Sequence, residues 1–136
     1  MKKYVVLMLT LIIISLFLSG CGQGEAEQKD FQEAAEKEAN IVFAEEFIMF
    51  LHEGRYDRAT KYFDDTMKKE LPANELEKLW TSLEEQLGDY KNQNYDSTQK
   101  MDDYDVILIN GIFEEDEVTF RVTIDQNEKI AGFYIE

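Results

Sequence analysis

Cysteine and histidine are almost missing from this sequence of 136 residues, which contains one of each. With Cys21 as the single thiol no intrachain disulfide is possible, so an oxidising compartment does not threaten the chain. Zinc sites of the usual type need several histidine or cysteine ligands, so a structural zinc site is excluded. We therefore predict no metal site and no bound cofactor.

Side chains suited to nucleophilic catalysis are also scarce. Beyond residue 21 the only serines are Ser82 and Ser97, and neither lies in a Gly-x-Ser-x-Gly turn. His52 falls in the last turn of a predicted helix, where the helix dipole favours a cation. We interpret His52 as a helix-end side chain and predict no catalytic residues.

Basic residues are few: 14 Lys and Arg stand against 29 Asp and Glu, a formal net charge of −15. This charge repels nucleic acid and anionic lipid headgroups, so neither is an expected partner, and it favours cations or basic partners. Acidic runs occur at 64–65, 102–105 and 114–117. Calcium is chemically conceivable there, but none has the EF-hand pattern, and we interpret them as solvated loops or helix ends.

The first 21 residues have the order of an export signal. Lys2 and Lys3 precede an uncharged apolar run of 15 residues from Tyr4 to Leu18, which is shorter than the ~20 residues of a membrane-spanning helix. Leu18-Ser19-Gly20-Cys21 follows at once and resembles the lipobox of bacterial lipoproteins. The alternative is an ordinary secretory signal with an incidental cysteine, or a buried thiol.

Resemblance to that class implies cleavage before Cys21 and attachment of two acyl chains, enough for durable anchoring. The expected location is the extracytoplasmic face of the cell membrane, with the lipid on Cys21 as the membrane contact. We divide the chain into a signal peptide at 1–20, the lipidated Cys21 with a flexible tether at 21–29, and a single domain at 30–136.

The first helix of the domain is predicted to start at Asp30. Asp30 and Glu33 have the spacing of a helix N-terminus, and apolar residues then recur at three- and four-residue steps as far as Leu51. Gly54 is a natural stop for this helix.

Shorter helical segments follow. We predict one helix from Tyr56 to Phe63, another turn over 66–70, and a last helix that Pro72 opens and Gly88 closes. Asn74, with an acidic residue three positions later, is a possible cap for this last helix.

After Gly88 the pattern changes from helical to alternating. Val118 to Ile124 alternates between apolar and polar residues, as a half-buried strand does. Further strands are predicted at 90–100, 106–109 and 130–135. Helices followed by strands indicate an α+β domain, with helices packed on a curved antiparallel sheet of three or four strands. Gly111 and Gly132 interrupt strands, which is typical of bulges that let a sheet curl.

Several stretches of the chain resemble one known family. They read F-A-E-E-F, L-H-E-G-R-Y-D-R-A-T-K-Y-F-D-D-T-M, L-P-A-N-E-L-E-K-L-W, V-T-F-R-V-T-I-D and K-I-A-G-F-Y-I-E. They are similar to the domain-of-unknown-function 3887 family, and the resemblance covers 30–136. It implies a cone-shaped fold like that of the nuclear-transport-factor-two-like superfamily. It also implies that members occur on lipoproteins or beside α/β-hydrolase domains. It transfers no catalytic residues, since none is established for the family.

Aromatic side chains fall on several predicted inward faces, where hydrophobic burial alone explains them. In a cone-shaped fold the same side chains would line a cavity, and the candidates are Phe47, Trp80, Phe120 and Tyr134. Both interpretations remain open from the sequence.

Three functions are compatible with these patterns. The first is a non-catalytic module that binds a small apolar ligand or an envelope protein through a pocket or the sheet face. The alternative is a small isomerase or dehydratase that uses a buried carboxylate or tyrosine as general acid or base. A third is support of a neighbouring membrane complex through the acidic surface.

Overall fold

The structure, a computed structural model, describes residues 24–136, with side chains from residue 28 onward. The predicted signal peptide and the predicted lipidation of Cys21 lie outside the described residues. The chain divides into two units between Ala35 and Glu36, and the fold below is that of Glu36–Glu136. Among the helices described, none combines the length and the apolar character that crossing a membrane requires.

The first described helix, α2, spans Gly24–His52. The predicted start at Asp30 is therefore wrong, and 24–29 is helical where a flexible segment was predicted. The physical reason lies in composition, because Glu, Ala, Gln and Lys all have high helix propensity and can extend a helix without burial. Consistent with this, every side chain from 28 to 39 is exposed. Gly54, with φ of +70°, follows the helix end as predicted.

Three short helices come next: α3 (Tyr56–Ala59), the 3₁₀ helix η1 (Thr60–Tyr62) and α4 (Asp65–Glu70). The sequence predicted these segments but not the cap of α4. The backbone N–H of Met67 donates to the side chain of Asp64 at 2.7 Å, so the Asp64 carboxylate satisfies one of the free N–H groups of α4.

Helix α5 spans Ala73–Leu87. Pro72 opens it as predicted, in the N-cap position with φ of −65°. The predicted cap at Asn74 is wrong, because the amide of Asn74 donates to Glu75 from inside the first turn and caps no backbone group. Gly88 closes the helix with φ of +77°.

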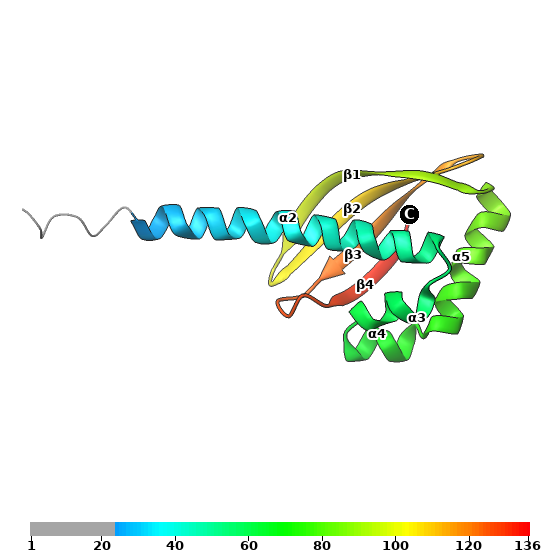
Figure 1. Ribbon diagram of the computed structural model, residues 1–136, viewed down its shortest axis with the longest axis horizontal. Helices are drawn as coiled ribbons and strands as arrows, with labels where there is room; N and C mark the ends of the chain where they lie inside the picture. The colour runs from blue at the N-terminus through cyan, green and yellow to red at the C-terminus, as the bar shows by residue number, and fades with distance from the viewer. Residues whose placement is uncertain (1–23) are drawn as a thin grey trace, which may run out of the picture. The chain divides into compact units, whose positions relative to one another are not determined.

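The sheet consists of four antiparallel strands: β1 (Tyr90–Met101), β2 (Tyr104–Phe113), β3 (Glu117–Ile124) and β4 (Ile130–Ile135). Their order in space is β1-β2-β3-β4, so each strand pairs with the next in sequence (Figure 1). In such a meander the first and third turns lie at the same end of the sheet. Residues 102–103 and 125–129 are therefore neighbours, which we call the hairpin end of the sheet.

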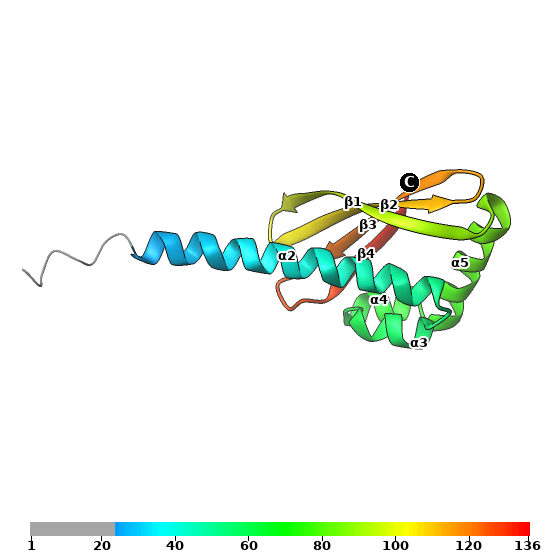
Figure 2. The same cartoon turned by 45° about the horizontal axis from the view of Figure 1, so that its top comes forward.

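The part of α2 from Glu36 onward lies along one face of this sheet together with the short helices and α5 (Figures 1 and 2). This inner face contains Ile107, Ile109, Phe120 and Val122, all of which are fully buried. The opposite outer face, on which Thr119, Arg121 and Thr123 alternate with the buried residues, carries none of the described helices. The predicted α+β class, with N-terminal helices packed on an antiparallel sheet, is confirmed.

The two strand glycines differ in their roles. Gly132 lies beside the predicted irregularity, because Thr123 pairs with Gly132 while Ile124 pairs with Ile130, which leaves one extra residue in β4. Gly111 marks no bulge, and the register across it is regular. It is required for another reason: a Cβ atom at Gly111 would overlap the aromatic ring of Phe120. The bulge prediction for Gly111 is therefore wrong.

We predict that Gly111→Ala lowers the free energy of unfolding by about 1–3 kcal/mol, because the buried ring of Phe120 has to move. Gly132→Ala is the matched control, since its Cβ would meet its nearest neighbour, in the Tyr134 side chain, at 3.3 Å. Urea unfolding followed by tryptophan fluorescence measures both. Equal destabilisation by the two substitutions would contradict the assigned role of Gly111.

Candidate functional site

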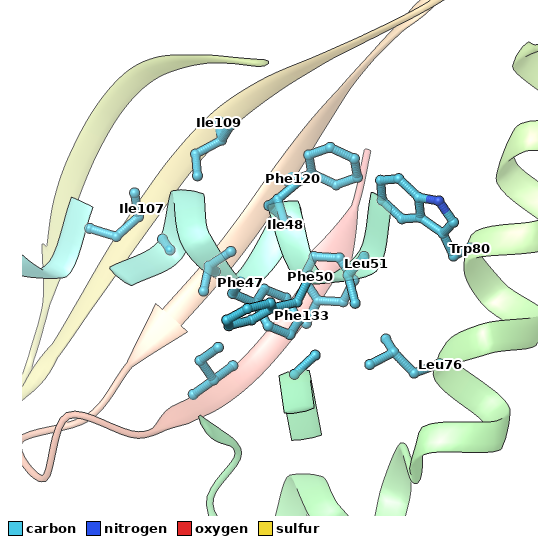
Figure 3. Close-up of a cluster of buried hydrophobic side chains, with 14 of the residues drawn as sticks. Phe47, Ile48, Phe50, Leu51, Leu76, Trp80, Ile107, Ile109, Phe120 and Phe133 are labelled. Carbon is cyan, nitrogen blue, oxygen red and sulfur yellow. The ribbon is translucent and has the colours of Figure 1, made fainter. Parts of the chain in front are cut away.

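The predicted pocket residues Phe47, Trp80 and Phe120 lie in the hydrophobic core (Figure 3). The indole of Trp80, which is 2% exposed, stacks on Phe120 with ring centroids 5.8 Å apart. Phe47, from α2, contacts Phe133 at 5.1 Å and Phe63 at 5.6 Å. The aromatic side chains that would have lined a cavity are thus packed against one another.

Tyr134, the fourth candidate, is separated from the other three. It is 62% exposed and pairs with Arg121 on the outer face. The extra residue in β4 explains the error, because it reverses the alternation that starts at Ile130. Phe133 points inward and Tyr134 outward, the opposite of what strict alternation predicts.

Polar groups at the inner face belong to a small network near the start of β1. The hydroxyl of Tyr90 donates to Gln93 at 2.8 Å, and the Gln93 amide donates to the carbonyl oxygen of Glu45 in α2 at 3.1 Å. Burial, and to a lesser degree the negative charge of Glu45, raises the pKa of Tyr90 to about 12. The network ties the edge strand to α2 and keeps Tyr90 neutral.

Among the described residues, the remaining polar groups near the inner face offer no acid–base pair. The indole N–H of Trp80 is buried without a hydrogen-bond partner. His52 is exposed at the end of α2, as predicted, and its ring lies 4.8 Å from that of Tyr90. Within residues 28–136, no charged side chain is buried.

The outer face of the sheet carries a shallow hollow of about 320 Å³, which we call the outer-face depression. Its lining is Met101, Tyr104, Val106, Arg121, Thr123 and Tyr134. Met101 and Tyr104 are exposed by 48% and 43%, around a Val106 that is buried. The Arg121 guanidinium lies 3.5 Å from both the Glu136 carboxylate and the Met101 sulfur. Two tyrosines, a methionine and an arginine are residue types enriched at the centres of protein interfaces.

A second hollow, of about 460 Å³, lies at the hairpin end beside α2, and we call it the acidic groove. Its carboxylates come from Glu36, Asp103, Asp105, Asp125 and Glu128. Lys100 forms an ion pair of 3.0 Å with Asp105 there. In the part of the chain that the structure describes, no group of three or more Asp, Glu, His or Cys side chains is arranged to hold a metal ion, and this includes the carboxylates of the acidic groove.

Several of these groups also stabilise the hairpin end. The Asn40 amide donates to Asp105 at 2.9 Å, which attaches α2 to the start of β2. Asp125 accepts the backbone N–H groups of Asn127 and Lys129 at 2.8 and 3.0 Å and so shapes the last turn. Asp103 and Glu128 are exposed, and their side chains have no such structural hydrogen bond among the described residues.

A third, smaller hollow joins the other two. It shares Tyr104 with the outer-face depression, and it shares Asp103, Asp125 and two neighbouring amides with the acidic groove. The three hollows are thus neighbours that share lining residues, and we call the surface that they line the hairpin-end cleft, which is aromatic at one end and acidic at the other. Local sequence pattern does not predict this cleft, because its two turns meet only through the meander order of the strands.

Comparisons with known proteins give a family and one distant relative. A family model described as "Protein of unknown function (DUF3887)" matches residues 44–133. Esterase EstD of Thermotoga maritima is 23% identical over 126 residues, which are 92% of this chain and 27% of that protein. The chain thus spans about a quarter of the length of this relative. No solved structure matches.

We predict that stability falls at high pH through Tyr90. The unfolded tyrosine loses its proton near its ordinary pKa of 10.0, whereas the folded one keeps it to about 12. The contribution of neutral Tyr90 to the free energy of unfolding is therefore complete below about pH 10. It is lost as the pH rises through about 12, and the free energy of unfolding falls by roughly 2–3 kcal/mol. Urea unfolding at these pH values should show a smaller fall for Tyr90→Phe, and equal falls in the two proteins would refute the assignment.

Proposed function

The chain belongs to the DUF3887 family of proteins of unknown function, and from this premise we propose that it is an extracytoplasmic lipoprotein whose folded domain binds a partner at the outer face of its sheet. The observation that carries the binding surface is the outer-face depression, where tyrosine, methionine and arginine gather on a sheet face that none of the described helices covers. Among the described residues, no Asp or Glu lines this depression, although the chain has 29 of them, and protein interfaces are likewise depleted in Asp and Glu.

The lipid anchor rests on the order of residues 2–21. A basic start, a short apolar run and Leu18-Ser19-Gly20-Cys21 form the pattern on which bacterial lipoproteins are processed. The net charge of −15 adds a second argument, because an acidic domain is not attracted to anionic lipids and needs a covalent attachment to stay at the membrane.

Binding is favoured over catalysis by the packing of the core. The isomerase or dehydratase alternative requires a buried carboxylate or tyrosine facing an open cavity, and the rings of Trp80, Phe120 and Phe133 occupy that space. Tyr90 is buried, but its hydroxyl is committed to Gln93.

The similarity to esterase EstD does not supply an esterase site. The chain corresponds to about a quarter of that relative. Ser82 is hydrogen-bonded by the Gln86 side chain, and the Ser97 hydroxyl donates to Asp96. Among the described residues no hydrogen bond joins either serine to His52, so no serine–histidine pair is formed there.

We expect Cys21→Ala to abolish lipid attachment and to move the protein out of the membrane fraction, because the thiol is the predicted attachment point. Mass spectrometry of the wild-type protein should show a mature N-terminus at residue 21 that carries acyl chains. An unmodified cysteine, or a mature start elsewhere, would disprove the anchor and leave the proposed binding surface to be tested by itself.

For the binding surface we predict that Tyr134→Ser reduces recovery of the partner by about tenfold when intact cells are crosslinked and the protein is purified. Leu79→Ser is the matched control, since Leu79 is also an exposed apolar side chain but lies on α5. If one defined partner is recovered and its recovery falls equally with both substitutions, or with neither, the outer-face depression is excluded as the binding surface.

A further inference from the structure

We propose that the partner presents a basic, apolar polypeptide segment, whose apolar side chains occupy the outer-face depression and whose Lys or Arg side chains extend into the acidic groove. This inference rests on the proposed function and specifies the chemistry of its partner. Protein rather than membrane lipid is the favoured occupant, because the bilayer surface is anionic and the cleft is strongly acidic.

The outer-face depression provides the apolar contact. Met101, Tyr104 and Tyr134 are each more than two-fifths exposed, and all three line one hollow above Val106. Covering them would remove apolar area from water, which is the main source of binding free energy at such sites. Tyrosine adds rigid contact area at low cost in conformational entropy.

The acidic groove determines the sign of the occupant's charge. Five carboxylates line it with one lysine, and that lysine already forms an ion pair with Asp105. An acidic segment would be repelled, whereas each Lys or Arg of a basic segment finds more than one carboxylate within the same hollow. Exposed pairs of this kind contribute modestly to affinity and strongly to selection between partners.

The residues that neighbouring hollows share favour one ligand over two separate ones. The smaller hollow shares Tyr104 with the aromatic end and Asp103 with the acidic end. A flexible segment lying across this smaller hollow would place apolar side chains at the aromatic end and basic side chains at the acidic end. A small rigid ligand could not reach both ends. The Arg121 guanidinium, which lies near Glu136, is at the aromatic end of the cleft. Its positive charge disfavours the segment's basic residues at that end.

The probe for this proposal is a short synthetic peptide in which lysine and leucine alternate, labelled with a fluorophore. Two matched peptides replace leucine by serine or lysine by glutamate. Binding to the full chain, purified from membranes in an uncharged detergent, is measured by fluorescence anisotropy against detergent alone. We expect the lysine–leucine peptide to bind at least about tenfold more tightly than either matched peptide.

Two variants locate the binding. Tyr134→Ser should weaken binding of the lysine–leucine peptide by about tenfold. The double substitution Asp103→Asn with Glu128→Gln should weaken it by about three- to tenfold. The control is Glu77→Gln with Glu85→Gln, which removes the same charge from exposed positions of α5 and should change affinity less than about twofold.

Equal weakening by the cleft and α5 variants would mean adhesion through net charge alone and would overturn the proposal. Equal affinity for the lysine–serine peptide would overturn it as well, because the aromatic end would then have no role. If no peptide binds while Tyr134→Ser still abolishes crosslinking to the partner, the proposed function stands and the basic segment is wrong. If the peptide binds in the cleft as described, the inference is supported.

Discussion

The aromatic ring of Phe120 lies between the main chain at Gly111 and the indole of Trp80, and the rest of the domain is arranged around this contact. Only glycine leaves room for the ring on the β2 side. On the helix side, Trp80 brings α5 onto the sheet, where it also meets Tyr90 and Phe113. The contact fills the space between α5 and β2 at this point of the core.

The sequence predicts the elements of this fold well because the apolar periodicity is strong and the stop signals are unambiguous. The four strands, the order of helices before strands, and the ends at Gly54 and Gly88 all follow from local pattern. The start of α2 does not, since a polar helix carries no apolar stripe by which periodicity could detect it. The α4 cap at Asp64 was equally hidden, because the acidic pair that contains it was interpreted as a helix end.

The site could be predicted only in part. Phe47, Trp80 and Phe120 were correctly placed inward, but whether such side chains line a cavity or fill it depends on how closely helices and sheet approach, and sequence pattern does not fix that distance. Tyr134 was misplaced because one extra residue in β4 reverses its direction. The acidic groove combines residues from α2 and two turns far apart in sequence, and these meet only once the strand order is known.

Under the proposed function, the negative charge keeps the domain off the lipid headgroups while the covalent anchor holds it at the membrane. A chain with a net charge of −15 is repelled by anionic lipid, so a covalent anchor would keep it near the membrane while its surface stays free of the headgroups. An acidic cleft that is kept off the bilayer remains accessible to basic segments of neighbouring proteins. The same charge makes the encounter sensitive to ionic strength, because exposed groups are screened over about 10 Å at 0.1 M salt. At higher salt the affinity must then come mainly from the aromatic end, where Tyr104 and Tyr134 offer contacts that salt does not weaken.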